Sequence, residues 1–86
     1  MIESNKQPLT QESFCELVRN AYDLPPDATL NLLAPLKDDV NWNSFNIVLI
    51  MANVESNFGI QIDENSLWEC ENLEKVFSLL QTKVGK

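Results

Sequence analysis

The residue in this sequence best placed for chemistry is a serine, Ser44, at the predicted start of an apolar helix that runs to Gly59. Asn43 or Ser44 can cap the beginning of this helix, and Gly59 is a suitable C-terminal stop. The first-turn N–H groups and the helix dipole favour a phosphate at such an end. Most serines at this position only cap a helix, so position alone does not assign a function.

The other polar residues offer little for catalysis. The chain has 0 histidines, which removes the commonest general base and metal ligand. We find no nucleophile–base pair and no glycine-rich phosphate loop. The acidic pairs Asp38–Asp39 and Glu69–Glu71 are interpreted as solvated carboxylates. The sequence therefore predicts that the chain is not an enzyme and holds no metal.

The overall charge and the cysteines restrict partners and location. A net charge of -7 disfavours nucleic acid and anionic membranes and favours basic partner surfaces. Cys15 and Cys70 are far apart and lack metal-ligand spacing, so we expect two buried, unpaired thiols. No apolar run has the length of a signal peptide or a bilayer span. These features predict a cytoplasmic monomer without membrane insertion.

The first half of the chain is predicted to hold one helix and a long loop. Residues 1–9 are polar, end near Pro8 and form a predicted flexible lead-in, followed by a single domain over residues 10–84. Thr10 caps a predicted helix over 11–22. Residues 23–43 form a long loop, with a helical turn near 29–34 that Pro35 ends. Loops of this length in small domains are often functional.

Three further helices are predicted in the second half, over 44–58, 64–69 and 73–83, the last two capped by Asp63 and Asn72. The fold class is therefore all-α, a four-helix bundle of three main helices and one short helix. Trp68 is expected at the core edge. The predicted core residues share helical spacing or anchor the loop: Phe14, Leu17, Val18, Leu36, Ile47, Ile50, Met51, Val54, Phe58, Ile62, Leu73, Val76, Phe77 and Leu80.

The helix over 44–58 carries two apolar faces. One face is assigned to the core. The other lies roughly opposite at 100° per residue. A surface helix of a small domain needs only one buried face, so the second is either covered by the long loop or open for a partner. This second face consists of Phe45, Val48, Leu49 and Ala52.

The segment Asp39-Val40-Asn41-Trp42-Asn43-Ser44-Phe45 resembles the signature of the acyl carrier protein family, which includes peptidyl carrier domains. That signature reads acidic residue, Leu, Gly, any residue, Asp, Ser, Leu. The apolar positions downstream match the family in register to about Leu80, and Leu36 to Val40 keep the spacing of its loop anchors. The resemblance covers about half the chain closely and the whole chain in element order.

By this resemblance, Ser44 is where a phosphopantetheinyl transferase attaches 4'-phosphopantetheine from coenzyme A. The terminal thiol of the arm then carries an acyl group as a thioester between enzymes of a specialised biosynthetic pathway. The implied partners are the transferase, an acyl- or aminoacyl-loading ligase, and downstream transferases or synthases. The expected docking residues are Asn43, Phe45, Val48, Leu49, Ala52 and Glu55.

Departures from the signature leave alternatives open. Asn41 replaces the glycine, and we expect it to make the turn because asparagine tolerates left-handed backbone angles. Asn43 replaces the aspartate and removes a charge, as in many peptidyl carriers. The helix also lacks the family's acidic stripe, which predicts docking by apolar contact. An aminoacyl or peptidyl carrier and an unmodified carrier-like interaction module are therefore the two alternatives.

Overall fold

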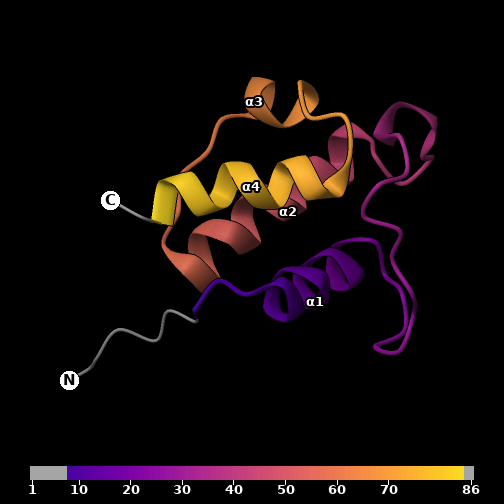
Figure 1. Ribbon diagram of the computed structural model, residues 1–86, viewed down its shortest axis with the longest axis horizontal. Coiled ribbons are helices and arrows are strands. Elements are labelled where there is room, and N and C mark those ends of the chain that lie inside the picture. The colour runs from indigo at the N-terminus through magenta and orange to yellow at the C-terminus, as the bar shows by residue number, and fades with distance from the viewer. Residues whose placement is uncertain (1–7, 85–86) are drawn as a thin grey trace.

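The computed structural model describes residues 8–84, which form four α-helices and no strand. The expected all-α fold is confirmed, whereas most of the predicted lead-in over residues 1–9 lies outside the described residues. Figure 1 shows α1 along one side of the molecule, α4 crossing α2, and the short α3 above α4. The elements are α1 Gln11–Ala21, the 3-10 turn η1 Leu36–Asp38, α2 Ser44–Phe58, α3 Glu64–Trp68 and α4 Leu73–Val84.

The predicted caps fix the ends of α1 and α2. Thr10 Oγ1 accepts a hydrogen bond from the Ser13 N–H at 3.1 Å, and the Ser13 hydroxyl accepts one from the Thr10 N–H at 2.9 Å. This reciprocal pair satisfies two donors that the helix leaves unpaired. At the C-terminal end of α2, Gly59 adopts φ 69°, a left-handed conformation that costs glycine little.

The two later helices begin at the polar residues expected for them. Asn72 Oδ1 accepts a hydrogen bond from the Lys75 N–H at 2.9 Å and caps α4. Before α3, the carboxylate of Asp63 instead accepts from the Ser66 hydroxyl at 2.8 Å. This hydrogen bond lowers the pKa of Asp63.

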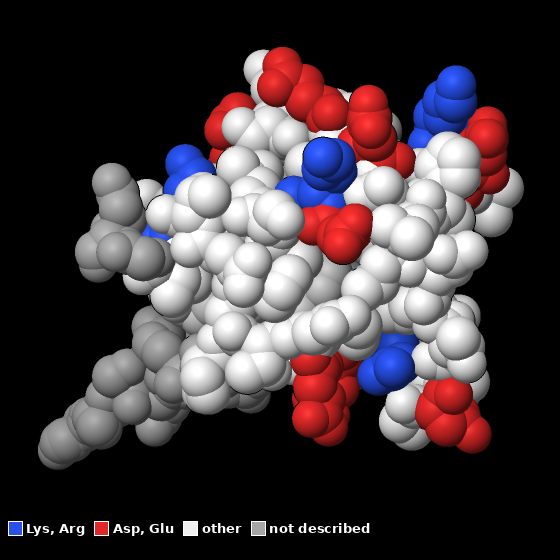
Figure 2. Space-filling model, viewed as in Figure 1, with Lys and Arg blue, Asp and Glu red and all other residues white. Residues whose placement is uncertain are grey.

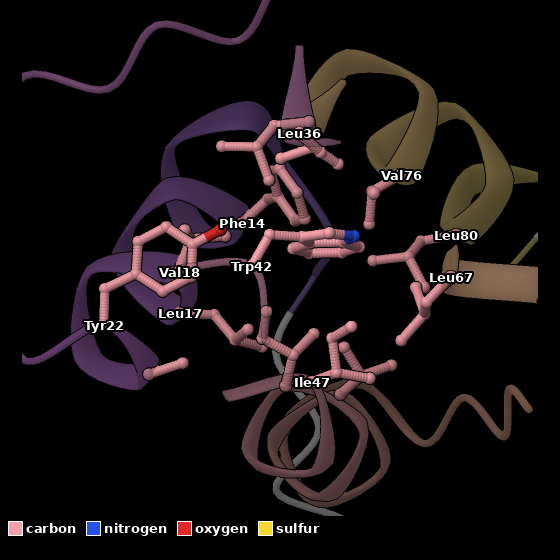
Figure 3. Packing of buried hydrophobic residues seen from close by; sticks show 14 of the residues in the cluster. Phe14, Leu17, Val18, Tyr22, Leu36, Trp42, Ile47, Leu67, Val76 and Leu80 are labelled. Atoms are coloured by element: carbon pink, nitrogen blue, oxygen red, sulfur yellow. The ribbon is translucent and has the colours of Figure 1, made fainter. Parts of the chain in front are cut away.

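The core gathers side chains from all four helices and from the long loop (Figure 3). Eleven of the predicted core residues are buried, while Met51, Ile62 and Phe77 only pack partly buried against them. Phe77 nevertheless joins α4 to α1, because its ring centroid lies 5.4 Å from that of Phe14. Five further residues are buried although they were not among the predicted core residues: Ala21, Tyr22, Trp42, Ile60 and Leu67.

The predicted helical turn near 29–34 was misplaced. Residues 31–34 contain one hydrogen-bonded turn, from the Ala34 N–H to the Asn31 carbonyl at 3.3 Å. The helical turn itself is η1, which Pro35 precedes rather than follows. Proline has the backbone φ that suits such a start and needs no N–H donor there, so it begins the turn.

The long loop is bonded to the helices at three places. Arg19 Nε donates to the Ala28 carbonyl at 2.7 Å. The Leu36 N–H donates to the Glu71 carbonyl at 2.8 Å, and the Glu74 N–H donates to the Leu32 carbonyl at 3.0 Å. The last two bonds tie the loop to the α3–α4 junction, so the loop has a defined position on the domain.

The expectation for the cysteines was half correct. Cys15 and Cys70 are unpaired, as predicted, but both are only partly buried. Cys70 Sγ donates to the Ser66 carbonyl at 3.4 Å. Burial, and to a lesser extent the charge of Glu69, raises the pKa of the Cys70 thiol, which therefore stays protonated at neutral pH.

Tyr22 caps the C-terminal end of α1 and turns its ring into the core (Figure 3). Its hydroxyl is buried and has no hydrogen-bond partner among the described residues. Burial, reinforced by the nearby Asp39 carboxylate, raises the pKa of Tyr22 far above its ordinary value of 10.0. Ionisation of this phenol therefore opposes folding.

We predict that Tyr22 makes the fold sensitive to alkali. Its raised pKa contributes stability that is complete below the unfolded pKa of 10.0 and is lost as pH rises toward the folded pKa. The wild type should lose up to about 1.4 kcal/mol of unfolding free energy per pH unit there, relative to Tyr22→Phe. Because the chain has 1 tyrosine, phenolate absorbance reports this group alone, and its appearance near pH 10 in the folded chain would contradict the assignment.

Candidate functional site

Ser44 is the first residue of α2, and its side chain is exposed to solvent. The hydroxyl is not used as the cap, because Asn43 Oδ1 accepts the hydrogen bond from the Asn46 N–H at 2.9 Å. Within residues 8–84 the Ser44 hydroxyl has no hydrogen-bond partner. The serine oxygen is therefore free to react with a group that arrives from solvent.

A set of amide hydrogen bonds holds the backbone on either side of Ser44. Asn43 Nδ2 donates to the Val40 carbonyl at 3.0 Å, and Asn46 Nδ2 donates to the Asn41 carbonyl at 2.9 Å. The Asn41 N–H donates in turn to Asp39 Oδ1 at 2.9 Å. Three asparagines and one aspartate thus fix the turn that presents the serine.

This turn differs from our expectation for Asn41. The only non-glycine residue with positive φ among those described is Asp23, at 61°. Asn41 therefore replaces a glycine without needing left-handed backbone angles. Val40 was expected to anchor the loop in the core, but it is 86% exposed. The buried residue of this segment is Trp42 instead.

The buried Trp42 determines which way Ser44 faces. Its indole lies within the core and extends toward Val76 and Leu80 (Figure 3). Its ring also meets that of Trp68 edge to face, with centroids 6.3 Å apart and an interplanar angle of 78°. Sequence reasoning treated this position as arbitrary, because a tryptophan in an irregular segment carries no periodic signal.

The electrostatics around Ser44 suit an incoming phosphate. The first turn of α2 contains no acidic residue, so no carboxylate on the helix opposes an anion there. The free N–H groups of that turn and the positive end of the helix dipole also favour a negative group. The residues present therefore fit a phosphodiester on the Ser44 oxygen.

The outward face of α2 is largely open, as expected. Phe45 is 73% exposed and Val48 is 55% exposed. Asn43, Ala52 and Glu55 are also exposed. Leu49 is the exception and corrects the prediction, because it is partly buried against the core. Leu30 and Leu32 of the long loop are partly buried against the core, and Phe45 and Val48 remain uncovered.

A groove continues from this face toward α3. It has a volume of about 580 Å³ and lies between α2 and the segment that follows Gly59. Gln61 Nε2 and Glu55 Oε2 form a 3.4 Å hydrogen bond across it. The groove extends the exposed apolar surface beside Ser44. Its lining residues are Val48, Met51, Ala52, Glu55, Ile60, Gln61, Ile62 and Asp63.

Comparison of the chain with known protein families, with curated proteins and with solved structures found no match. Across residues 8–84, no three side chains of the metal-binding types come together as a ligand set. In the same range, no helix combines the length and apolar character needed to cross a bilayer.

We predict that an introduced carboxylate changes the stability of the fold very differently at two neighbouring positions of α2. Val48→Asp should change the free energy of unfolding by no more than about 1 kcal/mol, because the side chain is exposed. Ile47→Asp should cost more than about 3 kcal/mol, because it buries a carboxylate in the core. Chemical denaturation of both variants measures the difference, and equal losses would mean that the outward face is part of the core.

Proposed function

We propose that the chain is a carrier protein that holds acyl groups as thioesters on a phosphopantetheine arm at Ser44. The observation that carries the proposal is an exposed serine at the start of α2 whose hydroxyl neither caps the helix nor bonds elsewhere in residues 8–84. A serine kept only as a cap would have its oxygen engaged. The signature-like order of residues 39–45 supports the same assignment.

The attachment step transfers the phosphopantetheine group from the pyrophosphate of coenzyme A to the serine hydroxyl. The Ser44 oxygen bonds to the phosphorus next to the pantetheine of coenzyme A, and the bond from that phosphorus to the adenosine bisphosphate breaks. The nucleotide leaves, and the serine proton passes to a base of the transferase. The first turn of α2 stabilises the negative phosphodiester. When bound, the arm supplies a terminal thiol that forms a thioester with the acyl group.

The chain itself then acts as a binding partner. Its exposed apolar residues Phe45, Val48 and Ala52 surround the serine on one side. With Glu55 as the one acidic residue in α2, charge contributes little to docking on this helix. We expect the transferase, the loading ligase and the downstream enzymes to bind here mainly by apolar contact.

An unmodified carrier-like interaction module is the second candidate. The exposed apolar face of α2 is equally consistent with an interaction module and with a carrier, because either function needs a partner to cover that face. The departures at Asn41, Asn43 and Phe45 also favour it. The two candidates differ in whether the Ser44 hydroxyl is ever esterified.

We predict that a broad-specificity phosphopantetheinyl transferase with coenzyme A adds one phosphopantetheine mass to the wild type. Ser44→Ala should abolish the addition, while the far-ultraviolet circular dichroism stays unchanged because the side chain is exposed. Ser78→Ala on α4, also exposed, is the matched control and should be modified normally. Absence of modification in the wild type would favour the interaction module.

We further predict that docking on α2 is apolar. Val48→Asp should raise KM for the transferase about tenfold with a smaller change in kcat, because it places a charge in the centre of the contact. Glu16→Gln on α1, exposed and distant in sequence, should leave KM unchanged. A rise in KM of more than about tenfold between low and physiological salt in the wild type would contradict apolar docking.

A further inference from the structure

A second groove is lined in part by Trp42, two residues before Ser44. It has a volume of about 730 Å³ and separates residues 33–37 of the long loop from residues 68–72 at the α3–α4 junction. The two backbone hydrogen bonds from Leu36 to Glu71 and from Glu74 to Leu32 hold these walls together. The groove is therefore formed before any ligand enters.

The groove offers apolar contact on both walls. Leu33 on the loop is 65% exposed, and Trp68 on α3 is 43% exposed. Trp68 Nε1 donates to Glu64 Oε2 at 2.9 Å, which satisfies its only polar group and orients the ring. Trp42, at the floor, supports that ring edge to face. Leu33 and Trp68 therefore offer apolar contact to a ligand from both walls.

The α3–α4 wall of the groove is negatively charged. Glu69 and Glu71 line it, are exposed, and have no side-chain partner within residues 8–84. Figure 2 shows acidic side chains gathered along the upper edge, over α3. Lys37, on the opposite wall, is the only cation that lines the groove. A ligand with an ammonium group near Glu69 and Glu71 gains an ionic contact, and a carboxylate there is repelled.

The groove is within reach of a group tethered to Ser44. Trp42 lines it, and the Cα atoms of Trp42 and Ser44 are at most about 7 Å apart along the chain. A tether also raises the local concentration of its end, so weak contacts are enough for occupancy. The groove therefore has one lining residue close to the attachment point.

We propose that this groove receives the cargo of the arm and that the cargo is an aminoacyl group with an apolar side chain. This inference rests on the carrier function proposed above. The side chain lies between Leu33 and Trp68, and the free ammonium group faces Glu69 and Glu71. In an aminoacyl thioester the carboxyl group of the amino acid forms the thioester bond. No carboxylate therefore remains that Glu69 and Glu71 would repel.

The test uses two free probes and the unmodified chain, so it does not depend on Ser44. Leucinamide carries the ammonium group, and isocaproamide has the same skeleton without the amino group. In nuclear magnetic resonance titrations leucinamide should shift the amide signals of residues 33–37 and 68–72 and the indole signals of Trp42 and Trp68. Isocaproamide should bind there about threefold more weakly, as expected for exposed ionic contacts.

Substitutions test the ionic contact with the glutamates and the apolar contact with the loop separately. Combined Glu69→Gln and Glu71→Gln should make the probes bind equally, whereas Glu16→Gln on α1 should preserve the difference. Leu33→Ser should weaken both probes alike. Equal binding to the wild type, tighter binding of isocaproamide, or probe shifts confined to other residues would each overturn the proposal. So would shifts at the groove that depend on protein concentration alone, because a second copy would then be the occupant.

Loading the chain distinguishes this inference from the carrier function itself. Leucyl-phosphopantetheine and isocaproyl-phosphopantetheine, each transferred to Ser44 from its coenzyme A thioester, should both attach, but only the leucyl group should shift residues 68–72 strongly. Attachment without that difference overturns the cargo assignment and leaves the carrier function intact. Failure of any attachment contradicts the carrier function, while discrimination between the free probes would still support the groove as a site for apolar ammonium ligands.

Discussion

The insertion of Trp42 into the core is the contact on which the position of the candidate site depends. Its burial removes a large apolar area from water, worth several kcal/mol. It also fixes the irregular segment before α2 relative to α3, through the edge-to-face contact with Trp68. Because Ser44 follows two residues later and α2 begins there, the positions of the exposed serine and of the groove that Trp42 lines depend on this one side chain.

A network of neutral amides surrounds that tryptophan and defines the turn. Asn43 caps α2 and also donates to the Val40 carbonyl, while Asn46 reaches back to Asn41. An aspartate at position 43 could cap the helix but could not donate to Val40, since an ionised carboxylate only accepts. The neutral residue thus provides a second bond to the turn and adds no negative charge at the position next to Ser44.

Sequence reasoning predicted the helices well because their signals are local. Thr10, Asn72 and Gly59 mark helix ends by hydrogen bonding or backbone conformation, and apolar spacing identifies the buried stripe between them. The partly buried Leu49 shows the limit of that spacing. It lies on the side of α2 roughly opposite Ile47, so its contact with the core depends on neighbouring elements rather than on the helical period.

The parts of the site that lie outside helices could not be predicted in this way. Trp42 and Ile60 are buried in segments without a repeat, so no periodicity distinguishes them from exposed neighbours. The second groove depends on two segments that are far apart in sequence and meet only through backbone hydrogen bonds. Ser44 itself was identified from sequence, but its free hydroxyl became evident only once Asn43 was seen to occupy the cap.

The two backbone bonds between the loop and the α3–α4 junction also determine how the domain moves. They make residues 32–36 and 71–74 one cooperative unit, so the amide protons of Leu36 and Glu74 should exchange with solvent together when that unit opens. The same two bonds hold the loop against the α3–α4 junction, so opening this unit separates the two walls of the second groove.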